Sequence, residues 1–193
     1  PQNRRHNPMN TGLIVSRYTA ALLCYATDTV AEHDVYRMMK RLSEYFAEIP
    51  DLETTFCDRM APESKRKNMF LNLFRDYPQH SLQVLSGFLD LLIRHRRENV
   101  IRSVSLQYLD KYRKEQGLTY GVLTTVVPVD QATTEKIKKV LDPEHPQKVE
   151  LELKQDKQLI GGFSLRVGMK VWDVSLAGRM REMRKTFGIN NKQ

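Results

Sequence analysis

The chain has 193 residues, carries 31 Lys and Arg against 23 Asp and Glu, and has a net charge of +8 with 40% hydrophobic residues. This length permits one domain or two small ones, and the apolar content excludes a wholly disordered chain. No apolar run approaches the about 18 residues of a membrane-spanning helix. The two cysteines cannot form a dense disulfide framework. The positive charge favours an acidic partner, a membrane surface or nucleic acid without choosing among them.

The first half of the chain has a helical pattern. Residues 1–9 are expected to be a disordered lead-in, because residues 1–8 contain no apolar residue, and Met9 is a candidate natural start. Helix formers dominate residues 12–27, and apolar residues three and four apart predict a helix over 31–48. Further helices are expected over 51–58, from Pro62 to Phe74, and from Pro78 towards a glycine cap at Gly117. Residues 10–117 are therefore predicted to form a bundle of five or six helices that ends in a connector helix.

The pattern changes after residue 117. The β-branched stretch 121–127 predicts a strand, and residues 130–141 have helical spacing. Alternating residues from Val149 predict a half-buried strand that returns over 159–167, so 148–167 is expected to be a β-hairpin. A closing helix is predicted from the spacing of Leu176, Met180, Met183 and Phe187. Residues 118–193 are thus expected to be a small α+β module, and the whole chain to be mainly α.

Sequence motifs of catalysis are missing. There is no Gly-rich phosphate loop, no H-E-x-x-H, no C-x-x-C pair and no G-x-S-x-G elbow. The five histidines are scattered along the chain. We therefore expect a non-catalytic protein without a metal site or a cofactor.

Two basic clusters, Arg94–Arg97 and Arg179–Lys185, allow a nucleic-acid-binding module as the alternative function. Cations near the end of a helix also complement the helix dipole, and charge runs usually line a solvated face. No aromatic residues are interleaved with these clusters, so a base-stacking platform is not indicated. Binding of protein partners, without nucleic acid, is the preferred interpretation.

The tail of the chain carries a recognisable motif. Residues 156–168, followed by 171–175 and the closing helix, resemble the signature of the delta subunit of bacterial ATP synthase, whose mitochondrial counterpart is the oligomycin-sensitivity-conferring protein. Shorter matches precede it in the expected order: Arg17-Tyr18 with Ala21-Leu22, Ala61-Pro62 to Lys67, and Leu91-Leu92 with Arg97 and Val100. The resemblance extends from Met9 to Phe187. Departures from the usual pattern occur at Arg94, Arg96, Trp172 and Val174.

The resemblance implies a non-catalytic stator subunit that ties the catalytic head of the rotary synthase to its peripheral stalk and resists rotation of the head. It implies a peripheral position at the cytoplasmic face of a bacterial inner membrane, or at the matrix face of the mitochondrial one. In the family, a groove between the first and fifth helices receives the N-terminal helix of an alpha subunit. The matching positions are Tyr18, Ala21, Leu22, Leu89, Leu92 and His95. For Leu89 and Leu92, packing in the bundle core is an equal alternative.

The resemblance also implies that the C-terminal module holds the C-terminal part of a b-type stalk subunit. The motif residues are Gly161, Gly162, Phe163, Asp173 and Ser175. A local structural role is favoured for them: a glycine pair marks a bulge or a close backbone approach, and Asp173 or Ser175 caps the closing helix. The basic face with Arg181 and Arg184 is expected to meet an acidic stalk helix.

Overall fold

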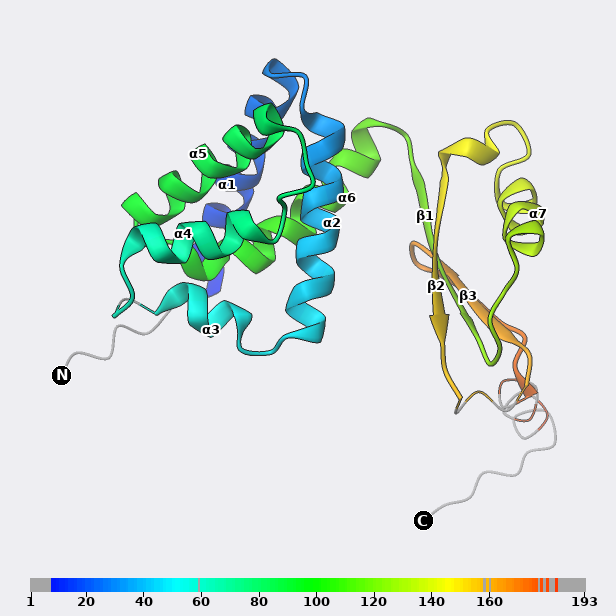
Figure 1. Ribbon diagram of the computed structural model, residues 1–193. Helices are drawn as coiled ribbons and strands as arrows, with labels where there is room; N and C mark the ends of the chain where they lie inside the picture. The colour runs from blue at the N-terminus through cyan, green and yellow to red at the C-terminus, as the bar shows by residue number, and fades with distance from the viewer. Residues whose placement is uncertain are drawn as a thin grey trace, which may run out of the picture. The chain divides into compact units, whose positions relative to one another are not determined.

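The computed structural model describes residues 8–58, 60–157, 159, 161–176, 178, 180 and 183 (Figure 1). The chain divides into two compact units, Pro1–Tyr112 and Arg113–Gln193. The first unit is helical, and the second contains a four-stranded sheet and a helix. The predicted fold class, a helical bundle followed by a small α+β module, is therefore confirmed.

The helices of the first unit follow one another with short connections. They are α1 (Pro8–Asp28), α2 (Glu32–Glu48), α3 (Leu52–Cys57), α4 (Glu63–Asn72), α5 (Gln79–Arg94), the short 3-10 turn η1 (Glu98–Val100) and α6 (Ile101–Glu115). Helix α1 begins earlier than the expected residue 12, since proline is tolerated in a first turn. Residues 8 and 9 of the expected lead-in therefore belong to this helix, and residues 1–7 lie outside the described residues. Helix α6 ends at Glu115, and the predicted cap Gly117 follows it with a φ of +63°. The Leu118 N–H donates to the Arg113 carbonyl across this turn. The helix expected from Pro78 towards Gly117 is not continuous: the chain leaves α5 through Arg96, which has a φ of +54°, and η1 and α6 are separate elements.

Apolar residues at helical spacing form the core of the bundle. On α2, the side chains of Val35, Met38, Met39 and Leu42 are fully buried. Rings from three helices complete this core, with centroids 6.3 Å apart for Phe46 and Phe70 and 4.1 Å apart for Phe56 and Phe70. Each of these buried side chains removes apolar surface from water and holds neighbouring helices together.

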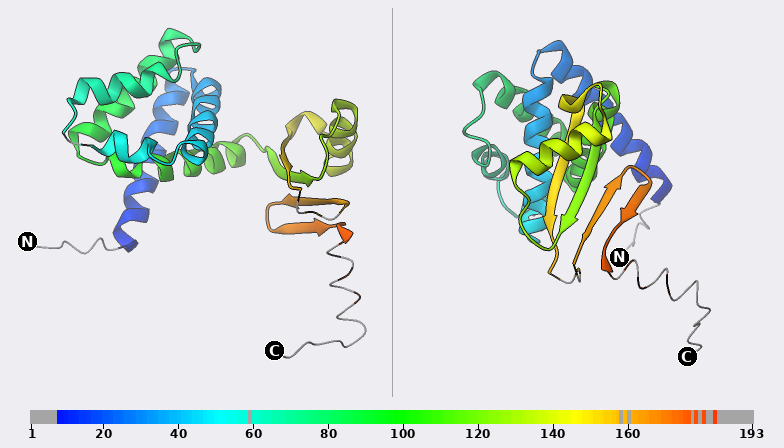
Figure 2. Two further views of the ribbon diagram at one scale, coloured as in Figure 1. Left: turned by 60° about the horizontal axis from the view of Figure 1, so that its bottom comes forward. Right: turned by 90° about the vertical axis from the view of Figure 1, so that its right-hand side faces the viewer.

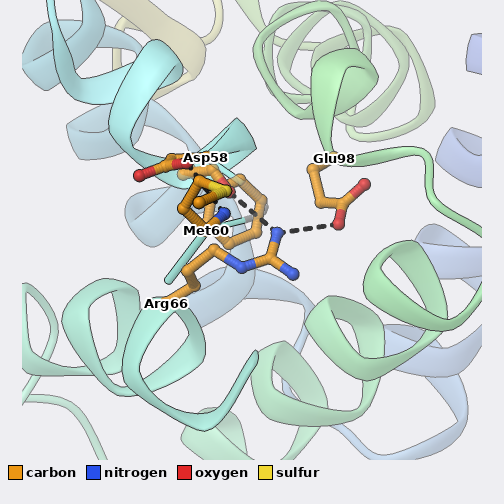
Figure 3. Close-up of polar contacts among 5 residues, drawn as sticks. Asp58, Met60, Arg66 and Glu98 are labelled. Atoms are coloured by element: carbon orange, nitrogen blue, oxygen red, sulfur yellow. Dashed lines mark hydrogen bonds and ion pairs between the residues drawn. The ribbon is translucent and has the colours of Figure 1, made fainter. Parts of the chain in front are cut away.

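A buried ion pair joins the loop after α5 to α4 (Figure 3). The Arg66 guanidinium donates through Nη1 to Glu98 Oε1 at 2.8 Å and to the Phe56 carbonyl at 3.1 Å. Both charged side chains are only 5% exposed. Because each charge would be costly to bury alone, the pair holds α3, α4 and η1 in one arrangement.

The second unit is built on one sheet with the order β2-β1-β3-β4. Its elements are β1 (Thr119–Thr125), α7 (Gln131–Leu141), the 3-10 turn η2 (Pro146–Lys148), β2 (Val149–Gln155), β3 (Phe163–Val167) and β4 (Lys170–Asp173). Strand β1 pairs in parallel with β2 and antiparallel with β3. A parallel pair needs a crossover, which α7 provides. Asp130 caps α7 by accepting the Thr133 N–H, and the Thr133 hydrogen bonds lower the pKa of Asp130.

The structure corrects the position of the predicted hairpin. Strands β2 and β3 do not pair with each other, because β1 lies between them. The hairpin is formed instead by β3 and β4, which are joined at Gly168 and Met169. The β-branched character of β1 suits this central position, where Val122 and Leu123 are buried.

Helix α7 covers one face of the sheet (Figure 2). The register aligns Leu153, Leu123, Leu165 and Trp172 in one row across the strands. Leu123 and Leu165 also line a cavity of about 220 Å³ together with residues of α7, so the row faces this helix. The row is buried at its centre and 47% and 44% exposed at Leu153 and Trp172. The module therefore has a small core of its own.

Candidate functional site

Helices α1 and α5 lie side by side (Figure 1). Their side chains border an open groove. Its volume is about 470 Å³. The groove is lined by Ile14, Arg17, Tyr18, Ala21, Leu91, His95 and Arg97. The four residues from α1 have the spacing i, i+3, i+4 and i+7, which places them on one face of the helix. This face combines an apolar, an aromatic and a small side chain with one arginine.

The structure brings together three of the six residues predicted for this groove. Tyr18, Ala21 and His95 line it. Leu22, Leu89 and Leu92 do not, because their side chains are 1%, 0% and 0% exposed. For Leu89 and Leu92 the structure thus favours the alternative of core packing, and for Leu22 it replaces the expected groove contact with a core position.

Four residues of the groove wall were not among the predicted positions: Ile14, Arg17, Leu91 and Arg97. Leu91 lies on α5, one turn before the C-cap residue His95 and beside the buried stripe of Leu85, Leu89 and Leu92. Leu91 was part of the motif match but was not assigned to the groove. Its spacing of four from His95 was the signal that could have identified it.

Packing beneath the groove holds its walls in place. The rings of Tyr18 and Phe88 meet edge to face, with centroids 6.5 Å apart. Beyond Ala21, a Cβ atom added at Gly87 would lie 3.8 Å from Tyr25 Cε1, an ordinary van der Waals distance. The Tyr25 ring therefore lies beside α5 at this position.

The end of α5 contributes two of the three basic residues that line the groove, His95 and Arg97. The chain leaves the helix through Arg96, which has a φ of +54°, while the Arg97 N–H donates to the Leu92 carbonyl at 2.8 Å. This hydrogen bond and the one from the Arg96 N–H to Ile93 form a Schellman turn. The turn places Arg97 beside Arg17 and His95 in the groove wall. The basic cluster predicted at 94–97 thus lies at the C-terminal end of a helix, where positive charge complements the dipole.

The motif residues of the C-terminal module form an interlocked turn. The Ser175 hydroxyl accepts the Gly178 N–H at 3.0 Å and donates to Asp173 Oδ1 at 2.5 Å. The prediction that Asp173 or Ser175 caps the closing helix is therefore confirmed, with Ser175 as the cap. Gly162 has a φ of +82°, and a Cβ atom there would lie 2.9 Å from Ser175 Cα. The predicted close backbone approach at the glycine pair is confirmed as well.

Other residues of this predicted surface have separate surroundings. Gly161 has a φ of +72° and is half-buried. Phe163 is 39% exposed and borders the cavity under α7. Arg181 and Arg184 lie outside the described residues. On the closing helix, Leu176, Met180 and Met183 are all more than half exposed.

The described part of the chain offers surfaces for binding. It contains no group of three His, Cys, Asp or Glu side chains that could hold a metal ion. No helix among the described residues has both the length and the apolar character that crossing a membrane requires. The groove and the exposed apolar side chains are typical of a protein that acts by binding other proteins.

Comparison with known proteins specifies the family. Residues 14–187 match the ATP synthase delta (OSCP) subunit family, and the chain belongs to this family of non-catalytic ATP synthase subunits. The chain is 28% identical to ATP synthase subunit delta of Phocaeicola vulgatus over 96% of this chain and 99% of the relative. It is 30% identical to ATP synthase subunit delta of Parabacteroides distasonis over 91% of this chain and 96% of the relative.

A solved structure has the same fold. A chain in the cryo-EM structure of the Toxoplasma gondii mitochondrial ATP synthase hexamer superposes with a TM-score of 0.61 at 15% identity. The match covers 91% of this chain and 98% of that chain. The family match over residues 14–187 confirms the resemblance stated from the tail motif, and this solved structure shows the shared fold.

Proposed function

We propose that the chain is the peripheral-stalk subunit that links the catalytic head of ATP synthase to the b-type stalk and resists rotation of the head during ATP synthesis. The groove between α1 and α5 is the observation that carries this proposal, because a static joint needs a preformed surface for each partner. The groove receives the N-terminal amphipathic helix of an alpha subunit. Tyr18, Ala21, Leu91 and His95 line the path of that helix.

The small side chain of Ala21 supports this role. Ala21 is exposed on the groove face of α1, so the backbone of a guest helix can approach closely above it. Leu22, Leu89 and Leu92 contribute from beneath by holding the two groove walls against the bundle core. Their role is therefore support of the groove rather than contact with the guest.

The second partner of the proposed joint is the C-terminal part of the b-type subunit, which binds the C-terminal module. Exposed Leu176, Met180 and Met183 offer an apolar surface for a stalk helix. Gly162, Asp173 and Ser175 act indirectly, by setting the direction in which the closing helix leaves the sheet. Arg181 and Arg184 are proposed to meet acidic residues of the stalk.

The proposed place of work is peripheral, at the cytoplasmic face of a bacterial inner membrane. The relatives from Phocaeicola vulgatus and Parabacteroides distasonis, both named ATP synthase subunit delta, support a bacterial setting. The matrix face of the mitochondrial inner membrane is the alternative, supported by the fold shared with the Toxoplasma gondii chain. Contact with the membrane would occur only through the rest of the complex.

The groove assignment is tested by titration with a synthetic N-terminal helix of the alpha subunit from the same organism. Calorimetry should show saturable one-to-one binding by the wild-type chain. Ala21→Trp should weaken it at least about tenfold, because the indole fills the space over which the guest backbone passes. Ala20→Trp is the matched control: Ala20 is also exposed on α1 but does not line the groove. Equal effects of the two variants would contradict the assignment.

A further inference from the structure

The groove between α1 and α5 is unbalanced in charge. Three of its seven lining residues are basic and none is acidic. No ion pair or hydrogen bond joins the side chains of Arg17, His95 or Arg97 to an acidic residue in the described part of the chain. The positive groups of the groove are therefore available to a ligand that carries negative charge.

The basic side chains come to the groove from two walls. Arg17 belongs to α1 and lies one turn before Ala21, which corresponds to about 6 Å along the helix. Arg97 follows the Schellman turn that ends α5, and the turn directs the chain back to the groove. The two arginines that line the groove therefore come from different walls, Arg17 from α1 and Arg97 from the segment after α5.

The remaining lining residues constrain the kind of ligand. Ile14, Tyr18, Ala21 and Leu91 form an apolar and aromatic floor beside the basic groups. A simple anion would leave this floor exposed to water, and the apolar face of a helix would cover it. Charge and floor together fit an amphipathic helix with an acidic side chain at the border of its apolar face.

We propose that Arg17 and Arg97 bind a carboxylate of the guest helix, about one turn from the residue that packs over Ala21. This inference rests on the proposed function, since the guest is the alpha-subunit helix assigned above. The apolar floor supplies contact area but accepts several registers of a helix. The carboxylate selects one register, because a shift of the guest by one turn would remove it from both guanidinium groups.

The experiment is a charge-swap titration of the full chain with the synthetic alpha-subunit helix. Arg17→Glu/Arg97→Glu should bind the natural peptide at least about tenfold more weakly than wild type at low salt. The acidic residues of the peptide are then replaced by lysine one at a time. A single one of these peptides should recover most of the lost affinity for the charge-reversed chain.

Lys65→Glu is the matched control for the change in charge. Lys65 is exposed on α4 and lines neither the groove nor a neighbouring cavity. The double variant Lys65→Glu/Lys139→Glu changes the net charge by the same amount as the groove variant. Lys139 is exposed on α7 and does not line the cavity under that helix. This control should leave peptide affinity within about twofold of wild type at moderate salt.

The outcomes separate this inference from the proposed function. If the groove variant weakens binding no more than the control, while Ala21→Trp still weakens it as expected, the carboxylate anchor is wrong and the groove assignment stands. If no lysine peptide restores affinity, the anchor is likewise overturned. If wild type binds no peptide at all but binds a single-stranded oligonucleotide through Arg17 and Arg97, both proposals fail.

Discussion

Arg66 and Glu98 carry opposite charges into the interior of the bundle, and their pairing connects segments that are distant in sequence. Arg66 is on α4, Glu98 is on η1, and Arg66 also binds the carbonyl of Phe56 on α3. Both side chains are nearly inaccessible to water. The desolvation of each charge is offset only while the other is present, so the loss of one partner leaves an uncompensated buried charge.

Glu98→Gln should therefore destabilise the chain by about 3–5 kcal/mol, as measured by urea unfolding. Arg102→Met is the comparison, because the Arg102–Glu53 pair is 3.7 Å long and Arg102 is 54% exposed. Its removal should cost less than about 1 kcal/mol. Similar losses for both variants would show that the buried pair has no special role.

The turn before β3 shows how one element depends on another. Gly161 and Gly162 both have a positive φ, and Gly162 lies against the backbone of Val174 and Ser175. That backbone follows β4 and leads into the closing helix, whose N-terminus Ser175 caps. The residues of the family motif therefore have a structural role: they fix the turn and the helix start that set the geometry of the proposed stalk-binding surface.

Gly162→Ala should unfold or displace this turn for two reasons. The added Cβ atom would clash with the backbone of Val174 and Ser175, and the positive φ at this position is unfavourable for alanine. Gly168→Ala is the control, since Gly168 has a φ of +56° with open space around it. The control should cost only the conformational penalty of about 1–2 kcal/mol in urea unfolding. Gly162→Ala should cost more and should increase amide exchange of Phe163 and Val174. Equal losses would contradict the role of the close approach.

At the scale of the whole molecule, the chain has two cores. The core of Pro1–Tyr112 is made by helices, and that of Arg113–Gln193 by α7 against the sheet. Side chains such as Leu92 and Leu123 are buried within one unit only. A substitution that creates a cavity in one core should therefore lower the stability of that unit and leave the other unchanged, because packed contacts carry the cooperativity of unfolding.

Leu92→Ala should lower the stability of the helical unit by about 2–5 kcal/mol. Native-state hydrogen exchange should show lost protection in α2 and α5 and unchanged protection in β1. Leu123→Ala is the reciprocal variant and should reduce protection of β1 and β2 alone. A parallel loss of protection in both units with either variant would indicate one cooperative structure.

Much of the fold followed from local patterns. The apolar spacing of α2 and α5 predicted these helices and most of their buried faces, because a helix repeats every 3.6 residues whatever it packs against. Glycine chemistry predicted the cap at Gly117 and the close approach at Gly162. The tail motif indicated the family from the sequence alone, and the family match over residues 14–187 agrees with it.

Pairing and exposure required the tertiary structure. The alternation in β2 and β3 predicted strands, but strand order depends on contacts distant in sequence, and β1 separates the two. The sequence did not predict strand β4, because all four of its residues are exposed and its sequence has no apolar alternation.

By itself, the sequence determined the class of fold, the helical periods, the capping turns and the family, since each depends on residues close together in the chain. Only the tertiary structure decided which face of α5 is free. Leu92 is buried and Leu91 lines the groove, although the two are adjacent leucines. The difference arises from how α1 and α5 pack, and this packing also places Arg17 and Arg97, 80 residues apart in sequence, in one groove.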